Sequence, residues 1–214
     1  MVPLFGESSS SQASGSRLGR LDPSVKTGGE PFHESGTPRD FSLVDFWSWS
    51  MSDLVSNAAR GVLAEFIVAK ALGLRTDCVR MAWDKCDLIG EGGLNIEVKS
   101  AAYIQTWAQK APSKITFGVQ SRRGWDANTN VQDKEARRHA DVYVFALLAH
   151  EDKNTIDPLD LNQWRFWAVS TRFLNERKRS QHSITMATLL KLVGVPVSYG
   201  ELPRCVKRAG EGAS

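Results

Sequence analysis

Two carboxylates and a lysine stand in strand-like segments around a glycine-rich turn, in the stretch DLIGEGGLNIEVKS at residues 87–100. These residues are Asp87, Glu97 and Lys99. Charged side chains are poor strand formers and cost free energy when they are buried. They therefore lie on the solvated face of a sheet, or they form a site. Because side chains alternate between the two faces of a strand, Glu97 and Lys99 are expected to point the same way.

The position of Asp87 depends on how the turn pairs the two segments. A hairpin whose three-residue loop is centred near Gly92 places Asp87 opposite Glu97 and on the same face, whereas an even-numbered loop would flip it. Two adjacent carboxylates repel each other unless a cation joins them, and Mg²⁺ prefers carboxylates, carbonyls and water. We therefore predict an Mg²⁺ site formed by Asp87, Glu97 and the carbonyl of Val98, with Mn²⁺ as an alternative ion.

Two further residues extend this predicted site. Lys99 would orient or acidify a metal-bound water, or would stabilise charge that develops on a phosphate. Glu65 lies in the clearest predicted helix, residues 56–74, which begins at Ser56 or Asn57 and ends at Gly73. The helical row of Glu65 is otherwise apolar, so a helix packed on the sheet would bring this carboxylate to the site. Together these groups are suited to phosphodiester hydrolysis.

The elements that must position these residues follow from periodicity and turn signals. Strands are predicted at residues 78–83, 86–90, 94–101, 114–120, 141–149 and 164–170. Loops are predicted at 121–130 and 151–163, a short charged helix at 133–140, and helices at 171–180 and 184–193. This order of helix, three strands, helix and strand predicts an α/β fold with a mixed central sheet flanked by helices.

Composition predicts a flexible leader at residues 1–40, one α/β domain at 41–208 and a loose tail at 209–214. The leader is rich in Ser, Gly and Pro, and such segments bury too little apolar surface to offset the entropy of ordering. Phe46, Trp47 and Trp49 are predicted to anchor this leader to the core.

The 214 residues carry a net charge of +3, which is compatible with a polyanionic partner. The sequence predicts neither a membrane span nor a secretory signal. The three cysteines lack metal-ligand spacing and are odd in number. A disulfide framework is therefore not expected, and a cytoplasmic location is predicted.

The pattern resembles the PD-(D/E)XK nuclease superfamily, which has the restriction-endonuclease-like fold. The resemblance lies in Asp87, a nine-residue gap and Glu97-Val98-Lys99, preceded by a helix that bears Glu65. It implies an αβββαβ core over roughly residues 55–170, with Mg²⁺ held by Asp87, Glu97 and Val98 while Lys99 assists the attacking water. Glu65 corresponds to the acidic residue that many members carry on their first helix. Cys86 stands where others have proline.

The resemblance implies an enzyme that cleaves DNA by direct attack of a metal-activated water, without a covalent enzyme intermediate. Cutting both strands at one place needs two sites, so a symmetric homodimer is expected. Nucleic-acid contacts are predicted from six residues whose alternative roles are packing or a solvated face: Tyr103, Gln105, Arg122, Arg123, Lys134 and Arg137.

Two other interpretations remain open from the residues alone. One is a catalytically silent nucleic-acid-binding module of the same fold. The other is a structural domain on which Glu97 and Lys99 form an exposed ion pair, and exposed pairs of this kind add little stability.

Overall fold

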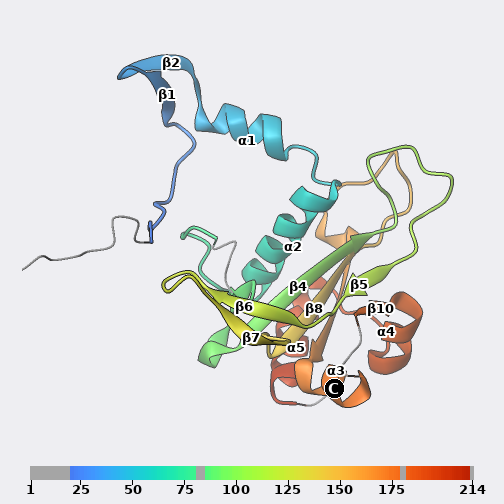
Figure 1. Cartoon of the computed structure of the whole chain (residues 1–214). Helices are drawn as coiled ribbons and strands as arrows, with labels where there is room; N and C mark the ends of the chain where they lie inside the picture. The colour runs from blue at the N-terminus through green and yellow to red at the C-terminus, as the bar shows by residue number, and fades with distance from the viewer. Residues whose placement is uncertain (1–19, 81–84, 179–181, 213–214) are drawn as a thin grey trace, which may run out of the picture.

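A four-stranded mixed sheet lies at the centre of the computed structural model, which describes residues 20–80, 85–178 and 182–212 (Figure 1). Its strands, in spatial order, are β3 (Leu88–Ile89), β4 (Asn95–Ala102), β8 (Val142–Leu148) and β9 (Trp164–Ser170). Strand β4 runs antiparallel to β3 and parallel to β8, and β9 runs antiparallel to β8. The predicted α/β class with a mixed sheet is therefore confirmed.

Both faces of this sheet are packed. Helices α2 (Asn57–Ala71) and α5 (Leu202–Gly210) cover one face, where Val68 and Val206 meet Val98 and Val144. Four elements cover the other face: β5 (Thr116–Gly118), α3 (Thr171–Lys178), β10 (Ser183–Thr185) and α4 (Met186–Val193). All seven residues of β8 are consequently buried, as expected of a strand covered on both sides.

Helix α2 follows its sequence signals closely. The Ser56 hydroxyl accepts a hydrogen bond from the N–H of Ala59 (3.4 Å), which satisfies one of the free donors at the helix start. Gly73 follows the helix with φ +65°, the left-handed conformation that commonly ends helices. The helix buries Ala64 and Val68 against the sheet and carries Glu65 beside them.

Replacing Ser56 with Ala is expected to lower the free energy of unfolding by about 1 kcal/mol, because the cap bond is lost. Urea denaturation followed by circular dichroism measures this change. Ser48→Ala, on an exposed position of α1 (Leu43–Met51), is the control and should leave the core transition unchanged. Equal effects of the two substitutions would contradict the assigned cap.

The segment between β4 and β8 differs from its prediction. Residues 121–130 were expected to be a loop and 133–140 a helix, but β6 (Arg122–Asp126) and β7 (Val131–Arg137) form an antiparallel hairpin. The turn explains this outcome, since the Asp126 carboxylate accepts from the N–H groups of Asn128 and Thr129, and Asn130 has φ +56°. Within the described stretch 103–141 no helix occurs, so the specific restriction-endonuclease-like core is not confirmed.

Other predicted elements also differ from the structure. Residues 78–80 are irregular rather than a strand, and 81–83 lie outside the described residues. Helix α5 was not predicted, although Leu202, Val206 and Ala209 have the spacing of a buried helical stripe. It includes the first two residues of the expected tail. Short 3₁₀ turns occupy η1 (Glu91–Gly93), η2 (Leu161–Gln163) and η3 (Tyr199–Glu201).

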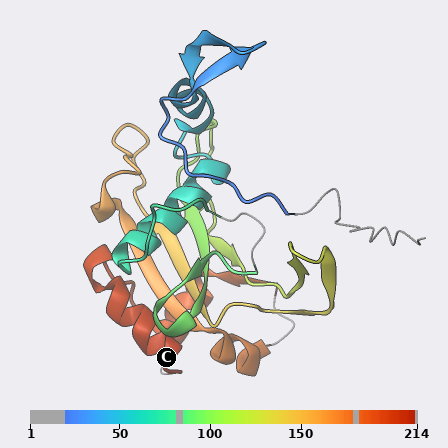
Figure 2. The same ribbon diagram turned by 90° about the vertical axis from the view of Figure 1, so that its left-hand side faces the viewer.

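An N-terminal arm projects from the domain (Figures 1 and 2). It contains the hairpin of β1 (Pro31–Glu34) and β2 (Thr37–Ser42), followed by α1, so this part of the expected leader has regular structure. Phe46, Trp47 and Trp49 are exposed on α1, with Trp49 at 85%. The prediction that they anchor the leader to the core is wrong. Trp47 packs instead on Gly28 of the arm itself, and no residue of this fully described helix is buried. Among the described residues no helix has the length and apolar character needed to span a bilayer.

Candidate active site

The hairpin of β3 and β4 sets the position of Asp87. Leu88 pairs with Ile96 and Ile89 with Asn95, a register that brings Asp87 level with Glu97. Gly92 and Gly93 have φ values of +67° and +81° and close the odd-numbered turn. The predicted pairing is therefore confirmed.

The Asp87 carboxylate lies against the backbone of β4. The backbone N–H of Asp87 donates to the Ile96 carbonyl (3.1 Å), and the Oδ2 atom of Asp87 accepts from the N–H of Val98 (2.7 Å). Burial raises the pKa of Asp87 to about 6, and the nearby charge of Glu97 adds to this rise. The Val98 N–H opposes the shift without cancelling it. Asp87 is therefore a partly buried carboxylate held beside the more deeply buried Glu97.

Glu97 is the most buried carboxylate at this site, with 2% of its side chain exposed. Its Oε1 accepts from Lys99 Nζ (2.5 Å) and also pairs with the guanidinium of Arg122. Glu97 and Lys99 thus share a face, as the alternation predicted. Two cations on one buried carboxylate offset the large cost of removing its charge from water.

Glu65 approaches the same region from α2. Its carboxylate is largely buried and forms two hydrogen bonds with the guanidinium of Arg80, one of them 2.8 Å long between Oε1 and Nη2. The charge of Glu65 is close enough to Asp87 to contribute to the raised pKa of that residue. The helix therefore brings its carboxylate to the site, as expected. Arg80 was not singled out, because it lies in a segment that reads as a buried strand.

Tyr143 is a second residue that sequence reasoning missed. It lies opposite Glu97 in the parallel ladder of β4 and β8. Burial, followed by the charge of Glu97, raises the pKa of Tyr143 to about 12. Its phenol therefore stays protonated at neutral pH. Strand alternation places Tyr143 on one face of β8, but only the register with β4 shows that this face is that of Glu97.

The predicted nucleic-acid contacts separate into two groups. Arg122, Arg123, Lys134 and Arg137 all lie exposed on the β6–β7 hairpin, and Arg122 alone of these four pairs with Glu97. Tyr103 and Gln105 follow β4 and face inward.

The Gln105 side chain forms hydrogen bonds within the protein. It is buried, and its amide donates to the Ala102 carbonyl (2.9 Å) and to Ser113 Oγ (3.4 Å). Tyr103 packs against the core of the Glu97 face. Contact with nucleic acid stays a prediction for all six residues.

The metal site also stays a prediction. Within residues 20–80, 85–178 and 182–212, no group of three or more His, Cys, Asp and Glu side chains is arranged to hold a metal ion. Each carboxylate has a protein partner instead: Lys99 and Arg122 for Glu97, and the Val98 N–H for Asp87. The donors nevertheless suit Mg²⁺, since they are hard oxygens, and a divalent ion would favour the ionised form of Asp87, which burial disfavours.

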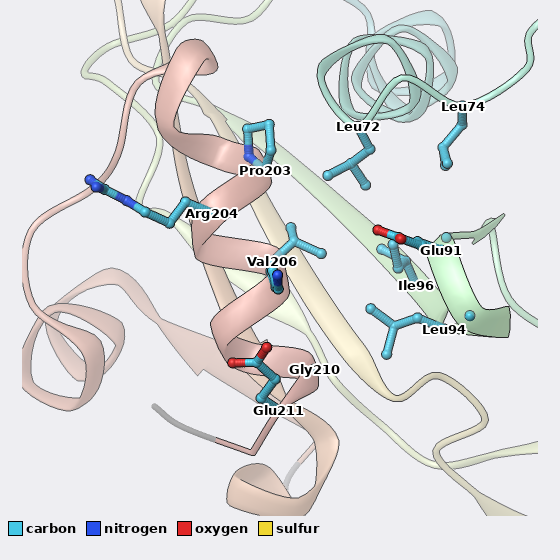
Figure 3. Close-up of a pocket in the computed structure, with 13 residues that line it drawn as sticks. Leu72, Leu74, Glu91, Leu94, Ile96, Pro203, Arg204, Val206, Gly210 and Glu211 are labelled. Atoms are coloured by element: carbon cyan, nitrogen blue, oxygen red, sulfur yellow. The ribbon is translucent and has the colours of Figure 1, made fainter.

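A pocket of about 800 Å³ opens beside this cluster. Glu65, Arg80 and Asp87 line it together with apolar residues of α2 and β3. A second pocket, of about 530 Å³, lies between α5, the end of α2 and the β3–β4 turn (Figure 3). Leu72, Leu94 and Val206 point into it, and its lining lacks Asp87, Glu97 and Lys99. Of these three residues only Asp87 lines the first pocket, beside Glu65, so that pocket reaches one edge of the acidic cluster.

Comparison with known proteins places the chain within a known family. A family model described as bacteriophage T4 endonuclease IV matches residues 45–187, a segment that contains Glu65, Asp87, Glu97, Lys99 and Arg122. No curated protein and no solved structure matches the chain. The family supports a nuclease, without testing the resemblance to the PD-(D/E)XK superfamily. Since the match covers about two thirds of the sequence, the chain belongs to the bacteriophage T4 endonuclease IV family.

Proposed function

We propose that this protein is an Mg²⁺-dependent endonuclease that hydrolyses DNA at the cluster of Asp87, Glu97 and Lys99. The family supports the endonuclease activity. The observation that carries the location is a buried carboxylate, Glu97, beside a partly buried carboxylate, Asp87, whose pKa is raised to about 6. Perturbed carboxylates of this kind cluster at functional sites.

Asp87, Glu97 and the Val98 carbonyl are the proposed ligands of the ion, and Mn²⁺ is proposed as a substitute. When bound there, the ion would supply positive charge that stabilises phosphate oxygens and would lower the pKa of water. Glu65 lies near enough to Asp87 to add to the negative charge of the site. This arrangement is the one that the PD-(D/E)XK resemblance implies.

Lys99 supplies a cation for the reaction. Its side chain is 28% exposed and its ammonium is held beside Glu97, so it can donate a hydrogen bond to the attacking water or to a phosphate oxygen. The water oxygen forms a bond to phosphorus while the bond from phosphorus to one bridging sugar oxygen breaks. The water loses one proton and the departing oxygen gains one, so no covalent enzyme intermediate is needed.

Substrate binding is assigned to the β6–β7 hairpin. Arg123, Lys134 and Arg137 are exposed there, next to Arg122 at the site, and arginine pairs well with phosphate. A symmetric homodimer would supply the two sites needed to cut both strands.

A catalytically silent nucleic-acid-binding module is the second candidate function. It is favoured by the finding that protein cations already neutralise Glu97 and Glu65 in the described structure. Both candidate functions would use the basic β6–β7 hairpin to bind nucleic acid, but only the endonuclease would cleave it.

Incubation of the protein with supercoiled plasmid separates these functions. In Mg²⁺ or Mn²⁺ the plasmid is expected to be nicked or linearised, and EDTA is expected to stop the reaction because the proposed ion is removed. Agarose gels measure the products, and a gel shift measures DNA binding. Plasmid that stays intact in both ions while the gel shift persists would support the silent module and overturn the nuclease.

A further inference from the structure

We infer that Arg122 is an exchangeable cation, which pairs with Glu97 in this structure and moves to a phosphate of the substrate when a divalent ion binds Glu97. The inference rests on the proposed function and names the residue that links metal entry to substrate binding.

The two cations on Glu97 differ in their freedom to leave. Lys99 lies on β4, two residues from Glu97, and 28% of its side chain is exposed. Arg122 begins β6, in a separate two-stranded sheet, and 55% of its side chain is exposed. The guanidinium of Arg122 is therefore already well hydrated and can leave at little cost, whereas the carboxylate that it leaves is 2% exposed and keeps, among the described residues, only Lys99 as a charged partner.

The backbone at Arg122 is held independently of its side chain. The Arg122 carbonyl lies 2.9 Å from the Nε2 of His139, in the segment that leads into β8. The guanidinium can therefore change partners while the start of the hairpin stays attached to the main domain.

The pairing within the β6–β7 hairpin indicates the second partner of the Arg122 guanidinium. Arg122 pairs with Arg137 directly across the two strands. Like charges at such positions destabilise a hairpin, so this pair favours an anion between or beside them. Glu97 provides the anion for Arg122 in this structure. Once Glu97 binds a divalent ion, a substrate phosphate is the anion that can serve both arginines, in the bidentate geometry that guanidinium groups favour.

If Arg122 exchanges partners in this way, its removal should have an effect that is not expected of a residue that only binds substrate. Arg122 and the metal compete for the same carboxylate, so removing the guanidinium should strengthen metal binding while weakening catalysis. Coupling of this kind between two ligands commonly amounts to a roughly 5-fold or larger change in affinity.

Arg122→Gln is expected to bind Mn²⁺ about 5-fold or more tightly than the unmodified chain, measured by calorimetry without DNA. Its single-turnover cleavage of plasmid is expected to fall by roughly 100-fold, since one charged group that stabilises the phosphate is lost. Arg172→Gln removes an exposed arginine that pairs with Glu176 on α3, and it should change neither quantity. Arg122→Lys keeps the charge and should leave the Mn²⁺ affinity near that of the unmodified chain. Circular dichroism checks that each variant is folded.

The outcomes distinguish this inference from the proposed function. If the unmodified chain binds Mn²⁺ and Glu97→Gln abolishes that binding, but Arg122→Gln binds Mn²⁺ equally or more weakly, the exchange is wrong and the nuclease proposal stands. If the unmodified chain binds no Mn²⁺, or Glu97→Gln has no effect on binding, the proposed metal site fails and the exchange fails with it.

Discussion

Glu97→Gln is expected to lower DNA cleavage by at least about 10³-fold, the upper part of the range seen when one preorganised electrostatic group is removed from an active site. Glutamine keeps the shape of the side chain and an oxygen that accepts a hydrogen bond. It removes the charge that Lys99 and Arg122 share and that the proposed ion requires. Plasmid cleavage in Mg²⁺ measures the loss, and calorimetry with Mn²⁺ should show weakened binding.

Glu91→Gln is the matched control. Glu91 is an exposed carboxylate in the turn of the same hairpin, so its charge is solvated and its replacement should leave cleavage unchanged. Cleavage by Glu97→Gln at the rate of the unmodified chain would place the reaction elsewhere in the family-matched segment and would overturn the proposed site.

Asp87→Asn is expected to lose cleavage by at least about 10²-fold and, at the same time, to stabilise the protein at pH 7.5. The pKa of Asp87 is raised from the usual 3.8 to about 6 in the folded chain. The folded state therefore holds the Asp87 proton more tightly than the unfolded chain does. Ionised Asp87 costs stability above pH 6, and this cost disappears as the pH falls from 6 towards 4.

The stability difference has an expected size. A shift of this magnitude corresponds to a cost on the order of 2–3 kcal/mol at pH 7.5, which asparagine does not incur. The melting temperature of Asp87→Asn should therefore exceed that of the unmodified chain by roughly 4–10 °C at pH 7.5, and the two should converge near pH 4. Mg²⁺ should raise the melting temperature of the unmodified chain alone, because a ligand stabilises the state that binds it.

Asp77→Asn is the control, because the pKa of Asp77 is shifted in the direction opposite to that of Asp87. Asp77 is exposed, and its hydrogen bond from Arg75 lowers its pKa, so asparagine should not stabilise the protein there and should leave cleavage intact. A melting temperature of Asp87→Asn equal to or below that of the unmodified chain at pH 7.5 would contradict the partly buried position of Asp87 beside Glu97.

The amino-acid sequence by itself determined the local geometry of the site. The odd-numbered turn around Gly92 placed Asp87 level with Glu97, and strand alternation placed Glu97 and Lys99 on one face. Helix α2, with its cap at Ser56, and the long buried strand β8 were likewise predictable. These features depend on residues within one or two turns or strands of each other, where periodicity and turn conformation leave few alternatives.

Only the tertiary structure decided which arginines meet these carboxylates. Arg80 binds Glu65 from fifteen residues away, and Arg122 binds Glu97 from twenty-five. It also decided that the charged segment after residue 130 pairs as a strand, that Tyr143 lies opposite Glu97, and that the aromatic residues of α1 stay exposed. Helix-forming residues and basic side chains suit several local structures equally. Their partners are chosen by which layers of the fold come into contact, and this is a property of the packed chain rather than of any one segment.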